Sequence, residues 1–162
     1  MNGIRSGEPA PSVRELTVPA ESRSLPEVTS FINAHLDTVQ CSHSVRMAID
    51  IAADEIFANI VRYAYRDTDK GSVTVRVGTG ADPNEVLLTF IDDGRPFDPL
   101  SAEMPDTTLP AKKRRIGGLG LFMVKNTMDG IDYVYRDGRN VLTLRKKIRT
   151  NGTNSAGSEA GL

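Results

Sequence analysis

The sequence predicts an α+β fold of two layers, in which helices cover one face of a mixed, mostly antiparallel sheet. Two stretches, 25–40 and 44–65, repeat apolar residues every three or four positions, which is typical of helices with one buried face. Two later pairs of strand-like runs are separated by short turns and predict hairpins. One layer of helices leaves the other sheet face uncovered, so we expect that face to meet a partner or a second copy.

Composition describes an ordinary soluble protein. The 162 residues suit one domain, and a net charge of −1 with 25% charged residues gives no overall field that would attract nucleic acid or membrane. We expect a flexible N-terminus over 1–11, a single domain over 12–148 and a disordered tail over 149–162. The sequence has neither an apolar run long enough to span a membrane nor a secretion signal, so we expect a cytoplasmic protein.

Cysteine and histidine offer little chemistry. Cys41 is the only cysteine, which excludes an intrachain disulfide and a cysteine-rich zinc site. His35 and His43 have no ligand spacing with a third metal-binding group, so we expect surface or capping residues and no transition-metal site.

The elements are expected in the following order. A short edge strand over 13–19 ends at Pro19 and precedes the two helices. Strands at 72–80 and 85–92 flank a turn with Pro83 and Asn84, and the second is so continuously apolar that it should be central. A glycine-rich loop opens a third helix within 116–130, and strands 131–135 and 140–148 close the domain around an Asp137-Gly138 turn.

The second helix carries a polar pair on the margin of its apolar face. Glu55 and Asn59 are one turn apart and about 40° apart around the axis, whereas Asp54 falls about 100° further round and should be solvated. A carboxylate and an amide at a buried margin are costly to desolvate without a partner, which a ligand could supply. The alternative is a surface acid beside an asparagine bonded within the helix packing.

Two loops are candidate parts of the same site. Asp92-Asp93-Gly94 follows the central strand and either places a carboxylate beside a pocket or simply starts a turn. Gly117, Gly118 and Gly120 precede a helix, where backbone N–H groups can hold a phosphate. The pattern is neither a Walker A loop nor a dinucleotide fingerprint.

Between these loops lies a long connection, 95–116, with four prolines and the basic run Lys112–Arg115. A connection of this length in a compact domain is usually a lid, a binding loop or disorder. The basic run is too short and too poor in aromatics for a nucleic-acid patch, and we expect a solvated loop or a phosphate-facing segment.

In their order along the chain, these three motifs resemble the nucleotide-binding boxes of the histidine-kinase-like (GHKL) ATPase superfamily. The boxes are Glu55 with Asn59, Asp92-Asp93-Gly94 and Gly118-Leu119-Gly120, and the resemblance covers about residues 12–148. The chain is most similar to the anti-sigma-factor serine/threonine kinases, which implies the histidine-kinase-like ATP-binding (Bergerat) fold. Arg95-Pro96-Phe97-Asp98 replaces a second glycine found in the larger ATPases and argues against a gyrase-like or Hsp90-like machine, whereas Tyr63, where several relatives carry histidine, puts little in doubt.

The resemblance also implies roles for individual residues. Asn59 would coordinate Mg²⁺, Glu55 would be the general base, and Asp92 would accept a hydrogen bond from the adenine amino group. Thr143 in the last strand would make a second adenine contact, and residues 95–116 would form the lid, with Lys112–Arg115 near the phosphates. The residues that would shape the nucleotide pocket are Gly94, Gly118, Leu119 and Gly120.

The function implied is that of a kinase in a partner-switching system. Such a protein binds Mg-ATP, phosphorylates a Ser or Thr of an anti-sigma-factor antagonist, sequesters a sigma factor and forms a homodimer, without binding nucleic acid or membrane itself. One alternative is a non-catalytic, nucleotide-gated binding module that switches a phosphatase or sigma factor. A plain ATPase is a weaker alternative.

Overall fold

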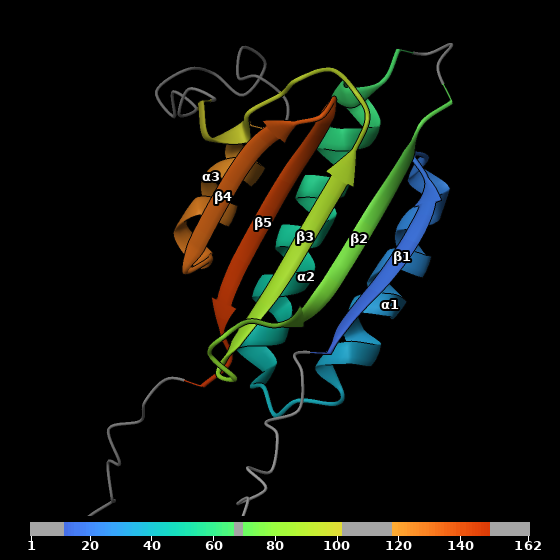
Figure 1. Ribbon diagram of the computed structural model, residues 1–162. Coiled ribbons are helices and arrows are strands. Elements are labelled where there is room, and N and C mark those ends of the chain that lie inside the picture. The colour runs from blue at the N-terminus through green and yellow to red at the C-terminus, as the bar shows by residue number, and fades with distance from the viewer. Residues whose placement is uncertain (1–11, 67–69, 102–117, 150–162) are drawn as a thin grey trace, which may run out of the picture.

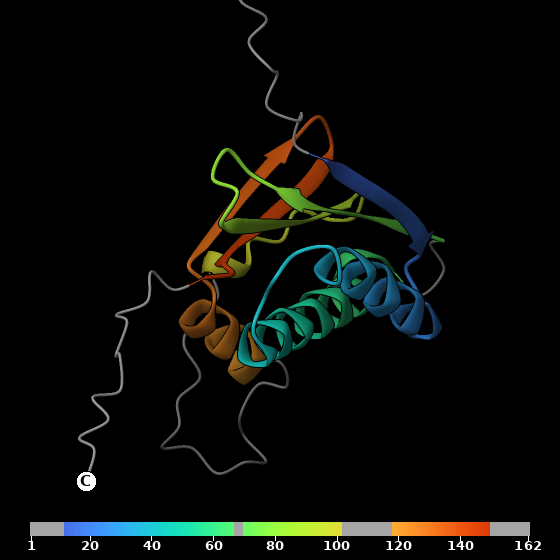
Figure 2. The same ribbon diagram turned by 90° about the horizontal axis from the view of Figure 1, so that it is seen from below.

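The computed structural model describes residues 12–66, 70–101 and 118–149, and these form three helices packed on one face of a five-stranded sheet (Figures 1 and 2). The strand order is β1-β2-β3-β5-β4, and every neighbouring pair is antiparallel. This confirms the predicted α+β two-layer fold. The elements are β1 (Val13–Pro19), α1 (Leu25–Leu36), α2 (His43–Asn59), β2 (Ser72–Thr79), β3 (Glu85–Asp92), α3 (Gly118–Thr127), β4 (Gly130–Arg136) and β5 (Arg139–Lys147).

The third strand is central, as its apolar run predicts. It pairs with β2 on one side and with β5 on the other, so β5 lies between β3 and the edge strand β4. Leu88 and Phe90 are buried against the helices, while Leu87 and Thr89 are less buried and belong to the opposite face. The strand therefore carries its final residue, Asp92, to the helix side of the sheet.

The predicted apolar face of α2 is its buried face. Ile49, Ala52 and Ile56 are all buried, and the Ser42 hydroxyl caps the helix by accepting a hydrogen bond from Val45 N at 3.2 Å. The regular α-helix ends at Asn59, and the chain continues as one π-helical turn, Ile60–Ala64, instead of the α-helix expected to residue 65. Single π turns often mark functional sites.

The first helix stops four residues earlier than its apolar pattern predicts. After Leu36 the chain tightens into a turn, in which Asp37 N donates to Asn33 O and the Thr38 hydroxyl donates to His35 O at 2.7 Å. Val39 still packs against the core from this turn. Because Val39 keeps the helical apolar spacing without being helical, the sequence pattern extends past the true helix end.

The face of the sheet away from the helices is open, as expected. Across its middle, the Thr89 and Thr143 hydroxyls are 3.1 Å apart and Arg145 pairs with Asp132 at 3.3 Å. A neighbouring cross-strand row is partly apolar and includes Ile91, exposed to 9%, and Val134, exposed to 40%. The open face of the sheet therefore carries both apolar and charged side chains.

His35 is a core residue, which corrects the expectation that it lies at the surface or caps a helix. Its side chain is 2% exposed, and within the part of the chain that the structure describes neither ring nitrogen has a hydrogen-bond partner. Its spacing from Val28 and Ile32 places it on the buried face of α1. Burial, assisted by the nearby Arg14 charge, lowers the pKa of His35 below its ordinary value of 6.5.

We therefore expect the free energy of unfolding to fall as the pH drops below about 6.5. Below that pH the unfolded chain binds a proton at His35 that the folded chain binds less readily. The free energy of unfolding therefore falls by an amount that approaches about 1.4 kcal/mol per pH unit. Urea unfolding between pH 5 and 8 measures this slope. His35→Leu should flatten it and His43→Gln, at the exposed start of α2, should not; equal slopes in wild type and His35→Leu would contradict the assignment.

Several sequence-based expectations lie outside the described residues. These are the flexible N-terminus over 1–11, most of the lid with Lys112–Arg115, Gly117, and the tail beyond Arg149. Before that gap, Pro99–Ser101 forms a short 3-10 turn where no regular element was expected. Within the described part of the chain, none of the helices has the length and apolar character needed to cross a membrane.

Candidate functional site

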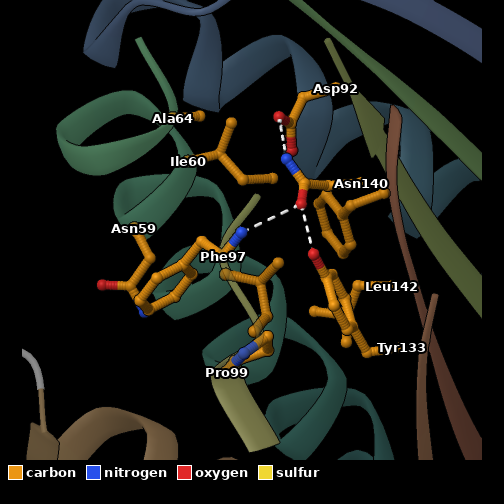
Figure 3. A pocket seen from close by; sticks show the side chains of 11 residues that line it. Asn59, Ile60, Ala64, Asp92, Phe97, Pro99, Tyr133, Asn140 and Leu142 are labelled. Atoms are coloured by element: carbon orange, nitrogen blue, oxygen red, sulfur yellow. Dashed lines mark hydrogen bonds between the residues drawn. The ribbon is translucent and has the colours of Figure 1, made fainter. Parts of the chain in front are cut away.

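Asp92 ends the central strand with its carboxylate buried on the helix side. The residue is 5% exposed, and its Oδ1 accepts a hydrogen bond from Gly94 N at 2.9 Å. The same oxygen accepts a second hydrogen bond from Asn140 Nδ2 at 2.9 Å (Figure 3). Desolvation raises the pKa of Asp92, and these two hydrogen bonds act in the opposite direction. Its hydrogen-bond partners are neutral, and no described residue forms a salt bridge with it; a buried carboxylate in this position is expensive, which points to a ligand.

The loop after Asp92 is fixed by its own backbone donors. Asp93 N donates to the Tyr65 hydroxyl at 3.0 Å, Arg95 N donates to Ala64 O at 2.8 Å, and Phe97 N donates to Asn140 Oδ1 at 3.1 Å. The Arg95 guanidinium also donates to Tyr63 O, so this loop caps the carbonyls of the π turn. The end of β3 is thereby joined to the end of α2.

Gly94 is required at this junction. A methyl group built on it would overlap the Ala64 backbone carbonyl, which cannot move without breaking the cap on the π turn. The glycine of the acidic motif thus permits close packing of two backbones.

A pocket opens beside Asp92, between the end of α2 and the last two strands. Its walls are mostly apolar, with the Asp92 carboxylate, the Asn140 amide and the Asn59 side chain as polar groups, and Asn59 and Asp92 enter it from different elements (Figure 3). A mostly apolar pocket with a carboxylate in its wall suits a nitrogenous base that carries an amino group. The remaining lining residues are Ile56, Ile60, Ala64, Phe90, Phe97, Pro99, Tyr133 and Leu142.

Asn59 and Glu55 share one edge of α2, as the helical spacing predicts. Asn59 is only 5% exposed, and its Nδ2 has no hydrogen-bond partner among the described residues. Glu55 is half-buried one turn earlier, whereas Asp54 is exposed. An orphaned buried amide at a pocket wall supports the reading in which a ligand supplies the missing partner.

The glycine-rich motif lies against Glu55. Helix α3 begins at Gly118 and packs on α2, and a methyl group built on Gly120 would overlap the Glu55 carboxylate. Gly120 is thus the position at which the third motif meets the first. Gly118 and Leu119 form the start of the helix, but their side-chain environment is outside what the structure describes.

We expect Gly120→Ala to fold normally but to displace Glu55. The atoms that the new methyl group meets are the end of a flexible side chain, so the fold can adapt at little cost while the carboxylate moves. Thermal unfolding should be nearly unchanged, and any activity that depends on Glu55 should fall at least about 100-fold. Gly138→Ala, where nothing lies within 4 Å but φ is +75°, is a contrasting variant that should lose stability and keep activity.

The structure does not bring Thr143 to the pocket, which corrects the predicted second base contact. Asn140 and Leu142 face the helices, and Thr143 alternates to the open face, where it bonds Thr89. Asn140 occupies the place that had been assigned to Thr143. The signal was present in the sequence, because Leu142 and Leu144 mark the buried face of that strand and Asn140 continues it.

The sequence and the fold are similar to those of known proteins. Residues 18–146 match the histidine kinase-like ATPase domain family. The chain belongs to this family. Within it, the chain is 31% identical over 103 residues to the serine/threonine-protein kinase BtrW of Bordetella bronchiseptica, covering 64% of this chain and 71% of that protein. The predicted membership in the kinase branch of the superfamily is thereby confirmed.

Other relatives carry similar names. The serine-protein kinase RsbW of Listeria monocytogenes is 32% identical over 101 residues, which are 60% of this chain and 63% of that protein. RsbW of Bacillus velezensis is 28% identical over 121 residues, covering 72% of this chain and 74% of the relative. The matched region thus spans less than two thirds of the Listeria protein.

A solved structure supports the fold of this family. The RsbU and RsbW domains of Rv1364c from Mycobacterium tuberculosis match with a TM-score of 0.60 and 20% identity, over 85% of this chain and 32% of that chain. At this identity the match concerns the fold alone. It agrees with the histidine-kinase-like architecture expected from the three motifs.

The residues present fit a nucleotide and a magnesium ion bound together. Among the described residues there is no group of three or more His, Cys, Asp or Glu side chains that could hold a metal. Mg²⁺, however, typically takes one or two protein oxygens and completes its shell with phosphates and water. The buried Asn59 side chain, beside Glu55, is suited to that limited role.

Proposed function

We propose that this protein is a serine/threonine kinase that binds Mg-ATP in the pocket between Asp92 and Asn59 and phosphorylates an anti-sigma-factor antagonist. The observation that carries the proposal is the position of Glu55, whose carboxylate lies against Gly120 and one helical turn from Asn59. A general base must lie beside the phosphate-binding end of the site. The kinase names of relatives at about 31–32% identity support the same activity.

Each residue has a defined task in this proposal. Asp92 accepts a hydrogen bond from the amino group of the base, and the apolar pocket walls exclude water from it. Asn59 holds Mg²⁺, which would neutralise phosphate charge and orient the terminal phosphate. Glu55 accepts the proton of the attacking Ser or Thr hydroxyl as its oxygen bonds to the terminal phosphorus and the bond to ADP breaks.

Backbone donors at Gly118, Leu119 and Gly120 would meet the phosphates in the same proposal. The start of a helix provides unpaired N–H groups, and glycine lets a phosphate approach closely. Helix α3 begins at Gly118, next to the Glu55 edge of α2. The phosphate end of the site is therefore expected between α2 and α3.

We further propose that the open face of the sheet is the homodimer surface and that the protein sequesters a sigma factor when its antagonist is phosphorylated. The apolar side chains of Ile91 and Val134 lie in one row of that face and the Asp132–Arg145 ion pair in the next. A self-complementary face of this kind suits a two-fold interface. Sedimentation equilibrium measures the mass, and a monomer at micromolar concentration would exclude the dimer.

The experiment that tests the kinase activity is phosphoryl transfer in vitro. The purified chain is incubated with labelled ATP, Mg²⁺ and the small anti-sigma-factor antagonists encoded in its own genome, and phosphoserine or phosphothreonine is located by mass spectrometry. We expect one antagonist to be modified at a single hydroxyl. Absence of transfer to every antagonist, while a related kinase modifies its own partner in parallel, would refute the proposal.

A further inference from the structure

One buried amide, that of Asn140, connects Asp92, the loop that follows it and Tyr133. The residue is 5% exposed and lies on β5 directly opposite Asp92 on β3. Its Nδ2 donates to Asp92 Oδ1 at 2.9 Å, and its Oδ1 accepts from Phe97 N at 3.1 Å and from the Tyr133 hydroxyl (Figure 3). Its Nδ2 also donates to Arg95 O at 2.8 Å. Asn140 lies outside the three sequence motifs.

The orientation of this amide follows from the chemistry of its partners. Phe97 N–H can only donate, so the amide oxygen must face it, and Arg95 O can only accept, so the amide nitrogen must face it. The NH₂ group is therefore directed at Asp92. Leucine, threonine or aspartate could not donate to Asp92 and Arg95 while accepting from Phe97.

This contact determines which oxygen of Asp92 is available. Both Gly94 N and Asn140 Nδ2 donate to Oδ1, and no hydrogen bond from the described residues engages Oδ2. The hydrogen bond from Asn140 also lowers the pKa of Asp92, against the larger effect of desolvation and the repulsion from Asp93. Among the described residues, Tyr65 and Tyr133 also lie within the influence of the Asp92 charge.

We propose that Asn140 is a positioning residue for base recognition: it fixes the Asp92 carboxylate with Oδ2 turned into the pocket and thereby sets the preference for a base with an exocyclic amino group. The proposal rests on the proposed nucleotide binding. A base that presents a carbonyl oxygen at the same point, such as hypoxanthine, would face the carboxylate with a second acceptor and be rejected.

The test compares the binding of ADP, whose base carries the amino group, with that of IDP, whose base carries a carbonyl oxygen in its place. Both are measured by calorimetric titration between pH 5 and 8. Asn140→Leu should weaken ADP binding about 10- to 100-fold and reduce the preference for ADP over IDP. It should also move the acid limb, the loss of ADP affinity at low pH as Asp92 becomes protonated, to higher pH. Tyr133→Phe removes one partner of the amide oxygen and should shift the same quantities in the same direction by less. Thr143→Val, three residues away on the open face, should change none of them.

The outcomes separate this inference from the kinase proposal. If the wild type binds neither nucleotide, the nucleotide site and the inference fail together. If the wild type binds ADP but folded Asn140→Leu keeps the same preference and the same acid limb, or loses ADP and IDP affinity equally, Asn140 is structural only and the inference alone fails. If Asn140→Leu does not fold, an unchanged preference and acid limb in Tyr133→Phe overturns the inference.

Discussion

We expect the replacement of Glu55 with glutamine to slow phosphoryl transfer strongly and to leave nucleotide binding intact. The amide keeps the size of the side chain and its place against Gly120 but cannot accept the proton of an attacking hydroxyl. Loss of a general base typically lowers the rate about 10²- to 10⁴-fold. Single-turnover transfer of labelled phosphate to the antagonist measures the rate, and calorimetry measures the affinity for ADP.

Asp54→Asn is the matched control for this variant. Asp54 is the adjacent acid but is exposed on another side of the helix, so its loss should leave the rate unchanged. Transfer by Glu55→Gln at the wild-type rate would remove Glu55 from the chemistry. If Asp54→Asn instead abolished transfer, the assignment of the catalytic edge of α2 would be wrong.

Replacing Asp92 with asparagine should have the largest effect on nucleotide affinity. Asparagine can still accept from Gly94 N and Asn140 Nδ2 through its oxygen, which then turns its NH₂ into the pocket toward another amino group. We expect ADP binding to weaken about 10- to 100-fold, because the charged acceptor is lost and two donors face each other. Calorimetric titration of ADP measures the change.

The neighbouring acid again supplies the control. Asp93 is exposed and pairs with Arg139 at 3.2 Å, outside the pocket, so Asp93→Asn should bind ADP normally. An Asp92→Asn protein with wild-type affinity would mean that the base does not bind at Asp92. Equal losses in both variants would point to an effect of net charge instead of a specific hydrogen bond.

Much of the fold was predictable because burial follows periodicity. The spacing of Ile49, Ala52 and Ile56 located α2 and with it the shared edge of Glu55 and Asn59. The apolar run of β3 likewise located Asp92 at the end of a central strand. These site residues lie at fixed offsets from a buried face, so local pattern sufficed to place them.

The remainder depended on contacts between distant segments. Asn140 meets Asp92 only because β5 pairs with β3 in one register, which no local pattern in either segment reveals. The π turn after Asn59 depends on capping by Arg95, from another element. The positions of Thr143 and His35, in contrast, follow from local pattern. Strand alternation places Thr143 on the open face of the sheet, and helical spacing places His35 on the buried face of its helix.

We propose one pocket that binds a nucleotide through Asp92 and a magnesium ion through Asn59. Calorimetric titration of ATP and ADP into the wild type and Asn59→Ala, with and without Mg²⁺, tests it most directly. We predict that Mg²⁺ strengthens binding to the wild type and that Asn59→Ala removes this dependence, because the buried amide beside Glu55 is lost. A wild-type protein that binds no nucleotide, or binds it equally with and without Mg²⁺, would contradict the account.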